Sequence, residues 1–125
     1  MTEEEEEAIV TATTGDLSAE VRPALTAEDV LAMQHLVRRI PVSVALVRAA
    51  VTLVRMTRPA DPQAPAFIKD YVSWGAGPRA SQYLVLGAKA RAALAGRPMA
   101  AADDLRAVAP TGLTHRLGLN FAAAA

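Results

Sequence analysis

The fold of this chain depends on one stretch, Trp74-Gly75-Ala76-Gly77-Pro78-Arg79-Ala80-Ser81. Two glycines release the backbone from the preceding helix, and Pro78 has the fixed φ and missing N–H that suit the first position of a new helix. Arg79 then lies beside unpaired N–H groups at the positive end of the helix dipole, where its guanidinium adds a bidentate anion ligand. The stretch predicts a phosphate-binding turn, although a surface arginine after a Gly-Pro break needs no ligand.

Helices are predicted on both sides of this turn. The helix that Pro78 opens should reach Leu94 or Ala95, because Gly96 suits a left-handed stop. A last short helix should stop at Pro110, and the acids in its first turn have a structural reason rather than a catalytic one. Upstream, Thr26 should cap one helix and Ser43 a second, which runs to about Arg58. The turn between these two is Ile40-Pro41-Val42.

Apolar residues that recur at helical spacing predict which faces are buried. Small residues around Ala88 should let a partner helix approach closely. Three aromatic residues at helical spacing, Phe67, Tyr71 and Trp74, are expected to anchor the core ahead of Arg79. The expected buried faces are Val30, Met33, Val37 and Ile40 in the first helix, Val44, Val47, Val51 and Val54 widened by Leu46, Ala50 and Leu53 in the second, and Tyr83, Leu86, Ala90 and Leu94 after Pro78.

The two ends of the chain are less regular. Thr2 and Glu5 fit a capping box, which is compatible with a short acidic helix, although a solvated or frayed tail stays equally open, and residues 11–23 are typical of a linker. Residues 113–121 alternate loosely and predict a short extended piece that closes the core. Gly118 interrupts that alternation where a β-branched or apolar residue is expected.

Composition limits the class of protein. The 125 residues, 52% of them hydrophobic, suffice for one modest core with a leader. Thirteen basic residues balance thirteen acidic ones, so the net charge gives no sign of nucleic acid. There is no cysteine, no basic signal peptide and no apolar run of ~20 residues. We therefore expect a soluble cytoplasmic domain without a membrane contact.

Several motifs in a fixed order carry a resemblance to a known family. From Leu25 to Phe121 the chain resembles the C-terminal lid of the MoxR-type AAA+ ATPases. The resemblance implies an all-α bundle of about five helices with a short extended C-terminal segment. It also implies that residues 1–22 are an acidic leader and linker from the end of an AAA+ core, residues 23–121 the lid, and residues 122–125 a frayed tail. The motifs are Leu25-Thr26-Ala27-Glu28-Asp29-Val30, Arg38-Arg39-Ile40-Pro41-Val42-Ser43, Leu53-Val54-Arg55-Met56-Thr57-Arg58-Pro59, Tyr71-Val72-Ser73-Trp74-Gly75-Ala76-Gly77-Pro78-Arg79-Ala80-Ser81-Gln82, His115-Arg116 and Asn120-Phe121.

The resemblance also implies a function. Such a lid closes over ATP and Mg²⁺ held mainly by the core, in a ring of neighbouring subunits. By resemblance Arg79 is the sensor 2 arginine that contacts the terminal phosphate, and Gly77, Pro78 and Ala80 lie beside it. The turn Ile40-Pro41-Val42 would provide adenine-side or interface contacts. The parent would be a chaperone-like ATPase acting on partner proteins, often ones with von Willebrand A domains.

This chain alone is not expected to hydrolyse ATP, because it has no Gly-x-x-x-x-Gly-Lys-Ser/Thr loop. Nothing in the sequence predicts a metal site. Two other functions stay open. One is a helical oligomerisation or protein-docking module without nucleotide contact. The other is a DNA-binding helical domain that uses Arg48, Arg55 and Arg58, but the zero net charge and the lack of a polar recognition helix argue against it.

Overall fold

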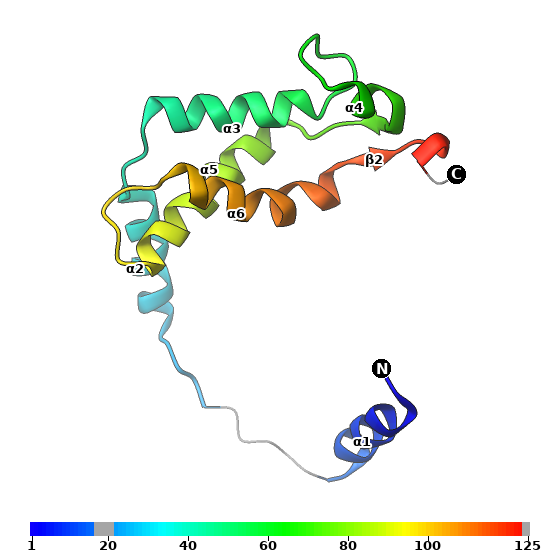
Figure 1. Cartoon of the computed structure of the whole chain (residues 1–125). Helices are drawn as coiled ribbons and strands as arrows, with labels where there is room; N and C mark the ends of the chain where they lie inside the picture. Colours follow the sequence, from blue (N-terminus) through cyan, green and yellow to red (C-terminus); the bar gives the residue numbers. More distant parts are fainter. Residues whose placement is uncertain (17–21, 124–125) are drawn as a thin grey trace. The chain divides into compact units, whose positions relative to one another are not determined.

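The computed structural model of the chain describes residues 1–16 and 22–123. They belong to two compact units, Met1–Val30 and Leu31–Ala125, which we describe separately. The described residues form six α-helices, two short 3-10 helices and one two-stranded sheet (Figure 1). The expected all-α class is confirmed. Among the described residues, no helix is both long enough and apolar enough to cross a bilayer.

The first unit contains the acidic helix α1 (Glu3–Thr14), which begins at the expected capping box. The Glu5 N–H donates to the Thr2 hydroxyl at 3.3 Å, and the Thr2 N–H donates to the Glu5 carboxylate at 2.8 Å. The prediction that the linker starts at residue 11 is wrong, because α1 continues to Thr14. Hydroxyls of the last two threonines donate to carbonyls one turn back, which suits them to a helix end. Residues 17–21 of the predicted linker lie outside the described part.

Helix α2 (Ala27–Arg39) starts at the predicted cap. The Asp29 N–H donates to the Thr26 hydroxyl at 3.1 Å, and the Thr26 N–H donates to the Asp29 carboxylate at 2.9 Å. The predicted buried face is wrong for Val30 and Met33, which are exposed, and no residue of α2 is buried; only Ile40, just after the helix, packs partly buried against the main core. Hydrophobic spacing shows which side chains share a face, but it does not show what covers that face.

Three helices build the core of the second unit: α3 (Val44–Met56), α5 (Pro78–Leu94) and α6 (Ala102–Leu113). Helix α5 packs against both α3 and α6 (Figure 1). A Cβ added to Gly87 would lie 3.3 Å from Val108, and one added to Gly112 would lie 2.8 Å from Leu84. The expected close approach of a partner helix to α5 is therefore confirmed, and small side chains allow it.

The buried faces of α3 and α5 agree with the predicted ones only in part. Helix α3 buries Leu46, Ala50 and Val54, all of which belong to the predicted face, but the other three valines of that face are exposed. Helix α5 buries Ala80, Leu84, Ala88 and Ala92, one in every four residues, whereas Tyr83 and Leu94 of the predicted face are exposed. Three of these four buried residues are alanines, which lets neighbouring helices approach closely. The main core consists of Leu46, Ala50, Val54, Ala76, Ala80, Leu84, Ala88, Ala92, Ala100, Leu105 and Leu113.

The predicted stop at Pro110 is also wrong, because α6 continues through this proline to Leu113. A proline inside a helix removes one backbone hydrogen bond. Here the residues that follow it are held by packing, since Leu113 is buried in the main core and Gly112 lies against Leu84. The Thr114 hydroxyl also donates to the Pro110 carbonyl at 2.6 Å.

A short sheet joins the middle of the chain to its C-terminal end. Helix α4 (Ala66–Tyr71) leads into β1 (Val72–Trp74), which pairs antiparallel with β2 (Gly118–Leu119). A 3-10 helix, Thr114–Arg116, connects α6 to β2, and a second one spans Phe121–Ala123. The predicted extended C-terminal piece is confirmed. Of the expected frayed tail, residues 124 and 125 lie outside the described part.

The aromatic residues do not anchor the core as predicted. Phe67, Tyr71 and Trp74 are all exposed, and Trp74 belongs to β1 rather than to a helix. The apolar cluster under α4 consists of Ala64, Ile68 and Val72 instead. A Cβ at Gly118 would overlap the indole of Trp74. Glycine therefore interrupts the alternation because Trp74 lies directly over it.

Candidate functional site

The turn that opens α5 has the predicted geometry. Gly77 is the N-cap in an extended conformation, Pro78 is the first helical residue, and the Ala80 N–H donates to the Gly77 carbonyl at 3.0 Å. No acidic residue lies in this first turn. Arg79 is exposed, and its side chain makes no hydrogen bond or ion pair within the described residues. A cation thus stands beside unpaired N–H groups, an arrangement that favours an anion.

Side chains of the two residues that follow α3 hold the backbone of this turn in place. The Ala76 N–H donates to the Thr57 hydroxyl at 3.0 Å, and the Ala76 carbonyl accepts from Nε of Arg58 at 2.9 Å. A Cβ at Gly75 would overlap the Thr57 carbonyl, so only glycine allows this approach. The sequence predicted that aromatic packing would support the turn of Arg79, but hydrogen bonds of Ala76 with Thr57, which accepts, and with Arg58, which donates, do so.

A pocket of about 440 Å³ lies at this turn. Two of its lining residues, His115 and Arg116, come from the 3-10 helix near the C-terminus. The pocket therefore brings together three basic side chains and no carboxylate, which makes it suited to an anion. The lining residues are Trp74, Gly75, Gly77, Pro78, Arg79, Ala80, His115 and Arg116.

Arg116 is fixed by two contacts. Its Nε donates to the Gly112 carbonyl at 3.0 Å, and its guanidinium carbon lies 5.0 Å from the centre of the Tyr83 ring. The sequence did not predict that His115 and Arg116 belong to the site, although both are part of the family resemblance. The signal that could have found them is a pair of adjacent basic residues in a tail that is otherwise uncharged.

The turn Ile40-Pro41-Val42 lies elsewhere. Ile40 and Val42 are partly buried against the main core, and the Pro41 carbonyl accepts from the Ala100 N–H at 3.3 Å. Next to this turn, Nζ of Lys89 donates to the Arg38 carbonyl at 3.0 Å. Lys89 follows Arg79 by ten positions in α5, about 15 Å along the helix axis. The structure therefore does not bring this turn into the pocket that Arg79 lines.

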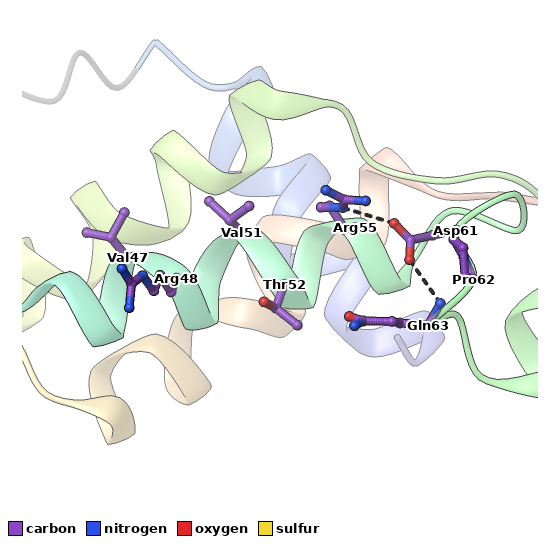
Figure 2. Close-up of a pocket in the computed structure, with 8 residues that line it drawn as sticks. All are labelled: Val47, Arg48, Val51, Thr52, Arg55, Asp61, Pro62 and Gln63. Atoms are coloured by element: carbon purple, nitrogen blue, oxygen red, sulfur yellow. Dashed lines mark hydrogen bonds and ion pairs between the residues drawn. The ribbon is translucent and has the colours of Figure 1, made fainter.

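A second pocket, of about 490 Å³, lies between α3 and the loop that follows it (Figure 2). Arg48 and Arg55 line it, but Arg55 forms an ion pair with the buried Asp61 at 2.9 Å. The Gln63 N–H and Arg55 lower the pKa of this carboxyl by hydrogen bonding. Since Arg58 bonds to the Ala76 carbonyl, two of the three arginines proposed for DNA hold the fold together.

The acidic pair of α6 is divided between surface and core. Asp103 is exposed and pairs with Arg106, whereas Asp104 is buried and accepts two hydrogen bonds from Arg97 and one from the Ala101 N–H. The hydrogen bonds from Arg97 are the largest cause that lowers the Asp104 pKa to about 2. Among the described residues, no group of three His, Cys, Asp or Glu side chains could hold a metal ion.

Comparison with known proteins agrees with this geometry. Residues 65–125 match the model of the AAA lid domain family. The chain is 31% identical over 121 residues to chaperone MoxR1 of Mycobacterium tuberculosis (strain ATCC 25618 / H37Rv), an alignment that covers 97% of this chain and 32% of the chaperone.

A crystal structure of a predicted ATPase from Cytophaga hutchinsonii ATCC 33406 superposes with a TM-score of 0.75 at 28% identity. The match covers 97% of this chain and 37% of that protein. The chain thus spans about a third of the length of each relative. Residues 65–125 include β1, α5, α6 and β2, the elements that carry Arg79 and its pocket. The chain belongs to the AAA lid domain family, in the form that MoxR-type ATPases carry.

Proposed function

We propose that this domain closes over ATP bound to an AAA+ core and that Arg79 contacts the terminal phosphate as sensor 2. The observation that carries the proposal is the unpaired Arg79 at the start of α5, in a pocket whose other charged side chains are also basic. Gly77, Pro78 and Ala80 would shape the turn around the phosphate. No carboxylate lines this pocket, so the residues present fit a phosphate group.

The physical consequence is a response to hydrolysis. A guanidinium beside the phosphoryl group that is transferred stabilises charge in the transition state. Once that group has left, the lid loses a charge-assisted contact with the nucleotide, and the lid and core can move apart. Mg²⁺ would neutralise phosphate charge and be held mainly by the core.

Two further surfaces fit the same role. The turn Ile40-Pro41-Val42 is proposed to contact the adenine side of the nucleotide. This turn follows Arg38, whose carbonyl accepts from Lys89, and Lys89 lies about 15 Å from Arg79 along the α5 axis, so an extended ligand such as a nucleoside triphosphate is needed to reach both. The exposed apolar side chains of α2, including Leu31 and Leu36, would contact the core or a neighbouring subunit in a ring.

The rest of the proposal concerns the whole protein. Residues 1–22 would end the AAA+ core and lead into the lid, which occupies residues 23–121. The parent would be a cytoplasmic, chaperone-like ATPase acting on partner proteins such as those with von Willebrand A domains. Fractionating cells that express the tagged protein, followed by co-purification, tests the location and the partners.

One observation favours a second function. The apolar face of α2 is uncovered, as expected of a protein-docking or oligomerisation module that needs no nucleotide. The two functions differ in what Arg79 does. A docking module without nucleotide contact would be unaffected by Arg79→Ala.

Fluorescence of Trp74 tests the proposed phosphate contact. This residue is the only tryptophan of the chain, it lines the pocket, and its side chain is 59% exposed. Excitation at the red edge of its absorption avoids absorption by adenine. We expect a weak, saturable change with MgATP and a smaller one with MgADP.

The variants decide whether Arg79 causes this change. Arg79→Ala should abolish the response, whereas Arg106→Ala should retain it, because Arg106 is an exposed arginine of α6 outside the pocket. An unchanged response in Arg79→Ala would show that the proposed phosphate contact is wrong.

A further inference from the structure

We propose that Arg116 is a second phosphate-binding residue in the pocket at the start of α5. The pocket then takes a chain of two or more phosphates rather than a single phosphate. This inference rests on the proposed function, because it concerns the same pocket. It adds a residue from the other end of the domain and a ligand class, polyphosphate.

Arg116 is held ready for a ligand. Its Nε is occupied by the Gly112 carbonyl at 3.0 Å, and one face of its guanidinium meets the Tyr83 ring. A guanidinium has five N–H donors, so four remain on its two terminal nitrogens. Because the side chain is already fixed, binding an anion costs it little conformational freedom.

The uncompensated positive charge in the pocket is better matched by a ligand with more than one phosphate group. Arg79 and Arg116 both line it, His115 adds a titratable base, and no carboxylate among the lining residues balances them. One guanidinium can pair bidentately with one phosphate. A second guanidinium in the same pocket is satisfied when the ligand presents a second phosphoryl group. The volume of about 440 Å³ is more than ten times the ~30 Å³ that one water molecule occupies, which leaves room for such a chain.

The short sheet places Arg116 beside the α5 turn. Trp74 in β1 pairs with Gly118 in β2, two residues after Arg116. The indole of Trp74 fills the space where a Cβ at position 118 would lie, so the two strands approach closely only with glycine there. The close pairing that Gly118 allows thus supports the position of Arg116 in the pocket that Arg79 also lines.

Inorganic anions test the inference without a nucleoside. Trp74 fluorescence is titrated with tripolyphosphate, pyrophosphate and orthophosphate at constant ionic strength. We expect the affinity to fall in that order. Arg116→Gln should weaken the binding of tripolyphosphate and pyrophosphate by roughly tenfold or more, the size of one hydrogen bond to a charged group, and leave orthophosphate binding nearly unchanged. Arg106→Gln, on the exposed face of α6, should leave all three unchanged.

The ring of Tyr83 provides a second, independent pair of variants. Tyr83→Phe keeps the aromatic face under Arg116 and should bind tripolyphosphate as the unmodified chain does. Tyr83→Leu removes that face and should weaken binding in the same direction as Arg116→Gln. Amide spectra of each variant establish that it is folded, and if Arg116→Gln is not, the Tyr83 pair decides. Equal binding by Tyr83→Phe and Tyr83→Leu would then overturn the inference.

The outcomes separate this inference from the proposed function. If Arg79→Ala abolishes binding while Arg116→Gln and Tyr83→Leu leave it unchanged, Arg116 is not a ligand but the sensor 2 proposal stands. If the three anions bind equally well, the polyphosphate class is wrong. If neither arginine matters, both proposals fail.

Discussion

The substitution Asp104→Asn tests how strongly one buried ion pair stabilises the lid. The Asp104 side chain is 3% exposed and accepts from both terminal nitrogens of Arg97, at 2.7 and 2.5 Å, and from the Ala101 N–H at 2.9 Å. Its pKa is lowered from 3.8 to about 2, first by the hydrogen bonds from Arg97. A gap of nearly two pKa units corresponds to about 2 kcal/mol of folding free energy. The same contact with Asp104 raises the pKa of Arg97, so the two pKa shifts reflect one interaction and count once in the free energy.

Asparagine has the shape of aspartate but no charge and only one accepting oxygen. We therefore expect Asp104→Asn to lower the free energy of unfolding by about 2 kcal/mol at pH 7. The sign of the pH dependence follows from the lowered pKa. The contribution of Asp104 is present above pH 3.8 and is lost as the pH falls towards 2, so the difference between the two proteins should shrink in acid.

Urea unfolding followed by circular dichroism at pH 7 and at low pH measures both effects. The matched control is Asp103→Asn, because the neighbouring Asp103 side chain is 88% exposed and pairs only with the exposed Arg106. That control should change stability by no more than about 0.5 kcal/mol. The reasoning is refuted if the two variants are equally stable at pH 7, or if the Asp104→Asn deficit persists unchanged in acid.

Two glycine substitutions make further predictions. Gly75→Ala should destabilise the domain by about 3 kcal/mol in urea unfolding, because the added Cβ overlaps the Thr57 backbone, which cannot move aside. Gly77→Ala, with nothing within 4 Å of the added atom, should cost less than about 1 kcal/mol, and equal losses would contradict the reasoning. Gly118→Ala should displace the Trp74 indole and change its emission spectrum, with loss of the β1–β2 amide contacts in NMR spectra. An unaltered Trp74 emission in that variant would show that the indole does not lie over Gly118.

Signals within a few residues predicted the helix boundaries well. The caps Thr26 and Ser43, the helix start at Pro78 and the left-handed Gly96 were all confirmed. Each of these depends on one side chain or one backbone angle, so the neighbours in space do not change it. Pro110 was the exception, because packing of the residues after it holds the helix together.

Burial could not be predicted from spacing alone. The face predicted for α3 included the buried Ala50 but also valines that are exposed, and in α5 the buried line runs through Leu84 rather than through the equally periodic Tyr83. The candidate site likewise contains one part that local sequence predicts and one part that it does not. The turn at Arg79 follows from local sequence, whereas Arg116 joins it only through the β1–β2 pairing, which connects residues far apart in the chain.

The most direct test of the sensor 2 proposal is an amide NMR titration of the chain with MgATP, then MgADP, with duplex DNA as a control. The proposal predicts the largest shifts at Gly77, Arg79 and Ala80, greater with ATP than with ADP and absent in Arg79→Ala. Equal shifts with both nucleotides, or shifts that persist in Arg79→Ala, would contradict a contact between Arg79 and the terminal phosphate. Shifts from DNA along Arg48 and Arg55 would instead favour a nucleic-acid interface on α3.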